Sequence, residues 1–397
     1  MRKNMITNDI KKANKSRIVK FIYKKNETSK QEIAQALGLS MPTVLQNVKE
    51  LLDNEIICEI GKYESTGGRK AKALSIIETV RYCIGIDITK NHISFVLLDL
   101  IGNIVSKERK REKYEDSIKY YKNLGESIDK FIFESHVDKN KILGVGISIP
   151  GIIDKENDLL IRSHILEVSN ISLKKFSQFI NYDTCFENDA SSAAFAELML
   201  CDKNSIYLSL SNTVGGAIFM NNEVYKGDNF KSAEFGHIII EPKGKTCYCG
   251  KQGCVDAYCS ARELSKYTDE NLDLFFDRLN NNDKKCVEVW NNYLNYLSIS
   301  ITNLRMIFDC NIILGGYVGG YLDNYRIELD NSLNKYNNFE VDVTYVKIGK
   351  YKKEATAIGI GMHFVDKFFN DLNWWLYKTV MLRRKIDLNI IVFILKK

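Results

Sequence analysis

The chain has 397 residues, of which 45% are hydrophobic and 27% charged. This length suits two or three domains, and the composition is ordinary for a globular protein that buries a sizeable core. The net charge of +6 lies entirely in residues 1–80, which carry 15 Lys and Arg against nine Asp and Glu. Such an excess of positive charge is typical of a segment that binds nucleic acid, although a solvated lysine-rich surface has the same composition.

The sequence lacks the features that mark secreted proteins and membrane-spanning proteins. The first 15 residues contain basic side chains but no apolar segment of the kind a secretory signal needs. No run approaches the roughly 20 apolar residues that span a bilayer. We therefore expect a cytoplasmic protein without a membrane partner, in which the ten cysteines are reduced thiols or metal ligands and not disulfides.

The first part of the chain predicts two short helices joined by a tight turn. Ser29 can cap a helix that Gly38 ends, and Ser40 can cap the next, with Pro42 tolerated in its first turn. The strand-like residues 56–77 that follow predict a two-stranded wing. This order is that of a winged helix-turn-helix, a unit that reads DNA in the major groove.

The helix after Ser40 has a polar side that is short and rich in amides. Such a side can enter a major groove, where Gln and Asn contact adenine, although any amphipathic surface helix also has a polar side. In the wing, "GGRK" presents basic side chains that can reach a minor groove, and a plain linker is the alternative reading. The residues expected to contact double-stranded operator DNA are Ser40, Thr43, Gln46, Asn47, Arg69 and Lys70.

From Tyr82 onward the chain alternates between strands and helices. β-branched apolar runs at 82–88, 92–105 and 142–151 end in turn residues, and a helical pattern occupies 117–135. A second set of strands and helices begins at Ser205. We therefore expect an α/β body of two lobes with a cleft between them.

Three cysteines and one histidine form a candidate metal site. Cys247, Cys249 and Cys254 supply three thiolates, and His237 lies ten residues upstream of the first. A Cys₃His set closes a tetrahedral zinc site without an open position, which predicts a structural Zn²⁺. The spacing C-x-C-x4-C is less common than C-x2-C, so free cysteines are the alternative reading.

These segments together resemble the ROK family, named from repressor, open reading frame and kinase. "EFGH" at 234–237 followed by "CYCGKQGC" at 247–254 is similar to its zinc signature. Further motifs occur in the family's order, namely "GVGISIPG" (144–151), "FENDASSAAFAE" (186–197), "SNTVGGAIF" (211–219) and "ILGG" (313–316). The resemblance covers roughly residues 82–362, and residues 14–72 resemble the winged helix-turn-helix of the family's repressors.

The resemblance implies a winged helix-turn-helix followed by a two-lobed actin-like, ribonuclease-H-like body that binds a sugar. The division it suggests is residues 1–80 for the DNA-binding domain, 81–190 for the first lobe completed by about 355–370, 191–354 for the second lobe with the zinc loop, and 371–397 for a tail of unknown role. Counterparts of Asn188, Asp189, Glu234 and His237 face sugar hydroxyls in the family, and Asp189 matches the general base of its kinases. For Asn188 or Asp189 alone, a helix cap is an equally good reading.

Two positions depart from the family's pattern. Asp256 stands where family members usually carry Glu, so a sugar contact there is shortened by one methylene and lost or reached through water. The kinase phosphate loop reads D-x-G-G-T-K, and the aligned residues 87–92 have Thr89 and Lys90 in place of both glycines. Because backbone amides cradle phosphate closely only where no Cβ intervenes, this change should obstruct ATP.

The resemblance and these departures predict a repressor that binds operator DNA as a homodimer or higher oligomer and is released by a monosaccharide. Xylose, glucose and N-acetylglucosamine all suit the expected site. The main alternative is an ATP-dependent sugar kinase that retains a DNA-binding domain. A regulator that gains DNA affinity with sugar, or responds to a phosphosugar, is the third reading.

Overall fold

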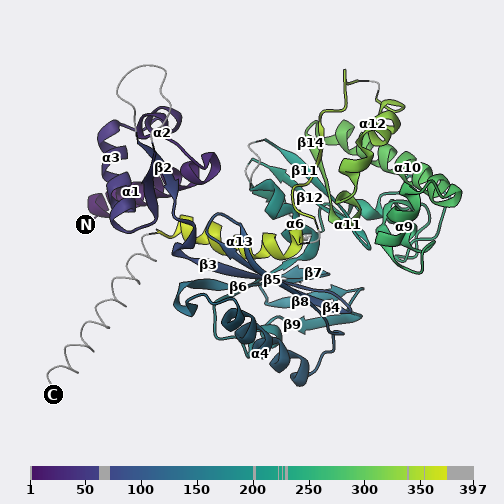
Figure 1. Cartoon of the computed structure of the whole chain (residues 1–397), viewed down its shortest axis with the longest axis horizontal. Helices are drawn as coiled ribbons and strands as arrows, with labels where there is room; N and C mark the ends of the chain where they lie inside the picture. Colours follow the sequence, from purple (N-terminus) through teal and green to yellow (C-terminus); the bar gives the residue numbers. More distant parts are fainter. Residues whose placement is uncertain are drawn as a thin grey trace.

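The computed structural model describes residues 2–61, 72–199, 203–221, 223–225, 227–228, 231–337, 339–352 and 354–372 (Figure 1). Its N-terminal unit comprises α1 (Arg2–Lys25), α2 (Lys30–Leu37), α3 (Met41–Asp53), β1 (Ile57–Ile60) and β2 (Ala73–Ile76). β1 and β2 pair antiparallel, as the predicted wing requires. Arg69 and Lys70, expected to contact DNA, lie outside the described residues.

The caps of α2 and α3 are those predicted from the sequence. Ser29 Oγ accepts a hydrogen bond from Glu32 N at 3.1 Å, and Ser40 Oγ accepts one from Thr43 N at 3.4 Å. Gly38 ends α2 with a φ of 62°, a left-handed conformation that glycine adopts without strain. Short-range side-chain chemistry therefore fixes the turn that orients α3.

The first lobe is built on a five-stranded sheet of order β10-β6-β3-β4-β5. Its strands are β3 (Tyr82–Ile88), β4 (His92–Asp99), β5 (Ile104–Arg111), β6 (Ile142–Ile149) and β10 (Thr184–Asn188). Helix α4 (Ile118–Glu134) covers one face through a shared apolar core. A small sheet of β7 (Ile152–Asp154), β8 (Leu159–Ser163) and β9 (Val168–Ser172), followed by α5 (Lys174–Ser177), extends this lobe.

The second lobe repeats this topology with the order β13-β12-β11-β14-β15. Its strands are β11 (Ser205–Leu210), β12 (Val214–Met220), β13 (Glu223–Tyr225), β14 (Asn311–Gly315) and β15 (Val346–Ile348). Its helices are α7 (Asp256–Cys259), α8 (Ala261–Ser265), α9 (Leu272–Asn280), α10 (Lys284–Phe308), α11 (Gly316–Gly319) and α12 (Arg326–Asn334). In each sheet the first strand is central, with two antiparallel strands on one side and two parallel strands on the other.

Two helices lie between the sheets and join the lobes. α13 (Ala355–Asn370) packs on β3 and β6 of the first sheet and on α6 (Asp189–Leu198), which in turn packs on β11 and β12. The approach is close, because a Cβ added at Gly359 of α13 would lie 1.6 Å from Ser192 O of α6. In Figure 1, α13 runs in yellow from the N-terminal unit to the level of α6. Among the described residues, no helix combines the length and the apolar character needed to cross a membrane.

Candidate functional site

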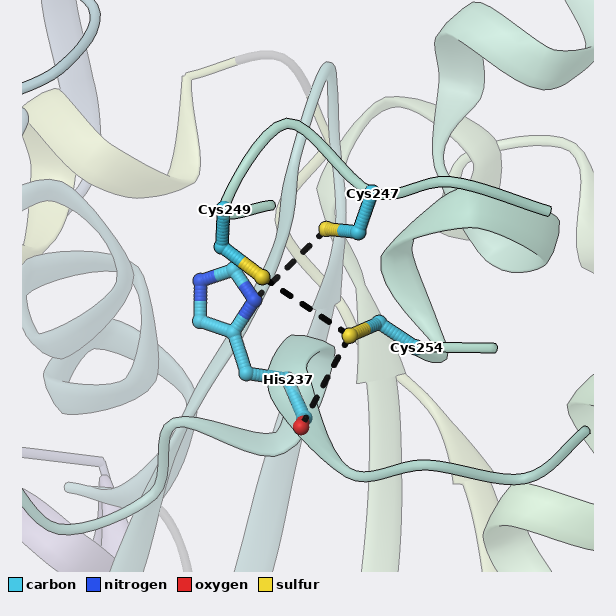
Figure 2. Close-up of side chains that lie close together, drawn as sticks. All are labelled: His237, Cys247, Cys249 and Cys254. Atoms are coloured by element: carbon cyan, nitrogen blue, oxygen red, sulfur yellow. Dashed lines mark hydrogen bonds between the residues drawn. The ribbon is translucent and has the colours of Figure 1, made fainter. Parts of the chain in front are cut away.

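His237 and three cysteines converge in the second lobe, as the sequence predicted (Figure 2). His237 Nδ1 lies 3.8 Å from Cys247 Sγ, and Cys249 Sγ lies 3.8 Å from Cys254 Sγ. All four potential ligand atoms lie within 4.8 Å of one another. Two thiolates bound to one tetrahedral Zn²⁺ at about 2.3 Å lie about 3.8 Å apart, so this donor set fits such an ion.

The backbone of the loop wraps the cluster by means of two glycines. Gly250 and Gly253 have φ values of 90° and 80°, and a Cβ at Gly253 would lie 1.9 Å from Glu241 O. Cys247 N donates to Lys251 O at 2.8 Å, which closes the turn. Cys247 and Cys254 are buried, and burial raises the pKa of the Cys247 thiol to about 12. The four ligand atoms can fill all four coordination positions of a tetrahedral metal ion, which leaves none open to a substrate.

A cavity of about 480 Å³ adjoins the cluster and opens between the two lobes. This volume lies within the ~300–1,000 Å³ that is usual for small-molecule sites. The first lobe contributes residues 150–153, which lead into β7, and the turn after β8. The second lobe contributes the start of β12, residues 231–234 and the loop of the three cysteines. The expected sugar contacts Asn188, Asp189, Glu234 and His237 all line it. Four residues that the sequence placed in one site are therefore brought together.

Asn188 and Asp189 stand where β10 ends and α6 begins. Asn188 Oδ1 accepts from Ala190 N at 2.9 Å and Ser191 N at 3.2 Å, while its Nδ2 donates to Gly151 O at 2.8 Å. The helix cap predicted from the sequence is thus present. The side-chain amide of Asn188 already makes three hydrogen bonds within the protein. Asp189 is the first residue of α6, and burial raises the pKa of its carboxyl, with the charge of Glu234 adding to the effect.

Asp256, one of the residues considered for the sugar site, does not line the cavity. The residue is 3% exposed, and its Oδ2 accepts a hydrogen bond from Val214 N at 2.7 Å. Arg262 Nη2 lies 3.6 Å from its Oδ1. The carboxylate therefore holds the start of β12 in place. The shorter Asp side chain thus finds its partners within the protein, and a direct sugar contact at Asp256 has no support in this geometry.

The residues aligned with the kinase phosphate loop form a tight turn between β3 and β4. Thr89 N donates to His92 O at 2.9 Å, and Lys90 Nζ lies 2.5 Å from Glu167 Oε1. Asp87, at the end of β3, is 8% exposed, and burial together with the charge of Asp189 raises its pKa to about 7 against the opposing charge of Arg109. Thr89 and Lys90, which both carry a Cβ, thus form this turn and are held by bonds within the protein.

The predicted DNA-contact residues of α3 fall on different sides of the helix. Ser40 and Gln46 are exposed, and Thr43 is half-buried with its Oγ1 2.8 Å from Ser40 Oγ. Asn47 is only 4% exposed, and its Nδ2 donates to Thr43 O at 2.8 Å. Asn47 belongs to the buried stripe that also contains Val44, so the predicted contact of Asn47 with DNA is wrong.

Sequence reasoning overlooked two residues of the cavity wall. Tyr248, between two of the cysteines, places its Oη 3.2 Å from His237 Nε2. His164, from the turn after β8, approaches the ring of Tyr248 with centroids 6.1 Å apart. The position of Tyr248 inside the metal motif was a signal that could have marked it. His164 had no such signal, because its neighbour is distant in sequence.

Comparisons with known proteins agree with this geometry. The model of the ROK family matches residues 83–366, and a winged helix-turn-helix DNA-binding model matches residues 12–57. A xylose repressor of Bacillus subtilis (strain 168) is 30% identical over 377 residues, which is 91% of this chain and 97% of the relative. The DNA-binding transcriptional dual regulator NagC of Escherichia coli (strain K12) is 25% identical over 257 residues, or 62% of each chain.

Solved structures share the fold. A ROK family transcriptional regulator, a homolog of the E. coli MLC protein, superposes with a TM-score of 0.68 at 20% identity, covering 91% of this chain and 97% of its own. A ROK family glucokinase from Streptomyces griseus reaches 0.57 at 21% identity, covering 70% and 98%. Because regulators and kinases both share the fold of the body, the fold alone does not separate their functions.

Proposed function

The chain belongs to the ROK family and carries an N-terminal winged helix-turn-helix, and from this we propose that it is a sugar-responsive transcriptional repressor. It binds operator DNA through α3 and is released when a monosaccharide occupies the cavity between the lobes. The observation that carries the proposal is that Asp189, Glu234 and His237 line one cavity, in the same chain as a capped helix-turn-helix. Its similarity to repressors over nearly the whole chain supports the same reading.

Carboxylates and a histidine suit a ring of hydroxyls, because they offer several directional acceptors and donors at fixed positions. Release requires that the sugar favour one arrangement of the lobes. Moving a two-state equilibrium from 1:99 to 99:1 takes about 5.5 kcal/mol of differential binding, which several such hydrogen bonds can supply. Xylose and N-acetylglucosamine, named in the relatives, are the first effectors to test.

We assign Zn²⁺ to the His237 cluster in a structural role. Three thiols and one imidazole give a closed tetrahedral shell, so the ion has no position open to a substrate. It would hold the loop 247–254 and fix the orientation of the His237 ring at the cavity wall. We also propose a homodimer or higher homo-oligomer acting in the cytoplasm, because one recognition helix covers only a half-site of an operator.

The alternative function is an ATP-dependent sugar kinase, favoured by the placement of Asp189 in the cavity. Against it stand the Cβ atoms of Thr89 and Lys90, and the ion pair that ties Lys90 to Glu167. Phosphate close to this turn would meet side chains where the family's kinases present bare amides. We therefore propose that the protein has no kinase activity.

Fluorescence anisotropy of labelled DNA from the gene's own upstream region tests the proposal. Protein is titrated first, followed by xylose, glucose and N-acetylglucosamine at a stated salt concentration, because phosphate contacts make affinity salt-dependent. Release by one sugar supports the repressor, and tighter binding with sugar would reverse the sign of the response. Phosphate transfer from Mg-ATP to any of these sugars would establish the kinase instead.

A further inference from the structure

Tyr248 links the metal loop to the cavity through the ring of His237. The hydroxyl Oη of Tyr248 lies 3.2 Å from His237 Nε2, and the two ring centroids are 5.3 Å apart at an angle of 68°. The other nitrogen of the same imidazole, Nδ1, faces Cys247 Sγ at 3.8 Å. The Nδ1 edge of the His237 ring thus points to the cysteine cluster, and the Nε2 edge points to Tyr248.

The direction of this hydrogen bond follows from the tautomer of the imidazole. A Zn²⁺ ion bound at Nδ1 would leave the proton on Nε2, so that the N–H would donate and the tyrosine oxygen would accept. A sugar hydroxyl accepts in the same way as a phenol hydroxyl. Because His237 has one Nε2–H, Tyr248 and a sugar hydroxyl compete for the same donor.

The ring of Tyr248 also approaches a residue of the first lobe. Its centroid lies 6.1 Å from that of His164, which belongs to the first lobe, with an interplanar angle of 62°. On its own lobe, the guanidinium carbon of Arg262 lies 5.6 Å from the ring centroid. The side chain is 47% exposed and lines the cavity, so it has room to swing away from His237. Moving it would remove a contact between the lobes and free a donor in the cavity.

We infer that Tyr248 is a gating and specificity-determining residue of the sugar cavity, which a monosaccharide must displace from His237 in order to bind. The inference rests on the proposed function and deepens it. Displacement exchanges the hydrogen bond from His237 to Tyr248 for one from His237 to the sugar. It also breaks the ring contact with His164, which couples occupancy of the cavity to the arrangement of the lobes. A sugar without a hydroxyl that reaches His237 Nε2 cannot open the gate.

The test compares wild type with Tyr248→Phe, which keeps the ring and removes the competing hydroxyl. Full-length protein, with its metal content measured, is titrated calorimetrically with D-xylose, D-glucose and N-acetyl-D-glucosamine. We expect Tyr248→Phe to bind the effector about two- to tenfold more tightly than wild type, the factor expected for one net hydrogen bond. The matched control is Tyr267→Phe, a partly exposed tyrosine outside the cavity, which should leave the affinity unchanged.

A second variant tests the contact between the lobes. His164→Ala leaves the metal loop and His237 unaltered, and we expect DNA release at severalfold lower sugar concentration because the contact no longer opposes rearrangement. Equal or weaker sugar binding by Tyr248→Phe would contradict the inference that the sugar displaces Tyr248 from His237. Weaker binding would mean that the hydroxyl contacts the sugar directly. If wild type binds none of the three sugars, the proposed function itself fails, which is a different result from a failure of the gate alone.

Discussion

Lys20 Nζ on α1 lies 2.8 Å from Asp366 Oδ1 on α13, so the DNA-binding unit is attached to the helix that joins the two lobes. Beside this ion pair, the rings of Tyr23 and Phe369 lie 5.4 Å apart. Apolar residues of α1 and of α13 belong to one continuous core cluster. The N-terminal unit is therefore packed on the body in this structure, and a shift of α13 would displace the residues of α1 that contact it.

The aromatic contact should contribute more to this attachment than the ion pair. Phe369 is fully buried, so Phe369→Ala should lower the free energy of unfolding by about 3–5 kcal/mol. Lys20 and Asp366 are each about one-third exposed, so Lys20→Ala should cost about 0–1 kcal/mol. Urea denaturation of both variants measures the difference. A loss in Lys20→Ala as large as that in Phe369→Ala would show that the ion pair contributes as much as the aromatic contact.

Gln46 and Asn47 are neighbours in sequence with opposite surroundings, which makes them a matched pair. Gln46 is exposed on α3, so Gln46→Ala should cost about 1–3 kcal/mol of discrimination at one base pair without loss of stability. Asn47 is buried, so Asn47→Ala should cost about 0.5–1.5 kcal/mol of stability through its bond to Thr43 O. Anisotropy on operator and unrelated DNA, together with urea unfolding, separates the two effects. A specific loss in Asn47→Ala at full stability would restore Asn47 as a DNA contact.

Gln46 and Asn47 also show which features of the N-terminal unit could be predicted from the sequence. Helix caps such as Ser29 and Ser40 were predictable because their chemistry is local. Asn47 was misplaced because its amide marked it as polar, although it lies three residues after Val44 and one before Val48, within the buried stripe of the helix. Periodicity places it inside, and a bond to the preceding turn satisfies its amide.

In the body, the meeting of His237 with three cysteines was predictable from the sequence motif, whereas contacts across the cavity were not. The resemblance aligned Asp256 with a sugar-contacting Glu, and its carboxylate accepts a hydrogen bond from Val214 N, a partner 42 residues away in the sequence. The meeting of Tyr248 with His164 depends on how the lobes pack. Such pairings arise from tertiary structure and leave no periodic signal in the sequence.

Asp87 should make the stability of the protein depend on pH. Its pKa is raised from 3.8 to about 7, first by burial. Between these values the folded state keeps a proton that the unfolded state has lost, so stability present at low pH is lost as pH rises toward 7. Asp87→Asn removes this loss, and its stability advantage over wild type should grow by about 3 kcal/mol between pH 5 and pH 8. Urea unfolding at both pH values measures it, and an advantage that does not change with pH would mean that Asp87 is already ionised in the folded protein at pH 5.

Removing the metal should abolish sugar binding and spare DNA binding. The loop 247–254 is shaped by the His237 cluster, whereas α3 lies in the N-terminal unit. We expect chelation, followed by atomic emission analysis of the protein, to weaken sugar affinity in proportion to the zinc lost, and added Zn²⁺ to restore it. Cys249→Ser should reproduce the defect, whereas Cys58→Ser, a thiol outside the cluster, should not. Unchanged sugar affinity in metal-free protein would remove the metal from any part in the cavity.

Asp189 should be required for the response to sugar but not for DNA binding. Its carboxyl lines the cavity at the first residue of α6, the helix on which α13 packs, whereas α3 is separate from it. Asp189→Ala removes hydrogen bonds to a charged group that are worth about 1.5–3 kcal/mol, so the sugar should bind at least about tenfold more weakly. Asp183→Ala, at the exposed residue before β10, is the matched control and should behave as wild type. Anisotropy with operator DNA measures both properties in one titration. If Asp189→Ala still released DNA at the wild-type sugar concentration, the sugar would have to be held elsewhere. A site that hydrogen-bonds the Asp189 carboxylate cannot lose that group without losing affinity.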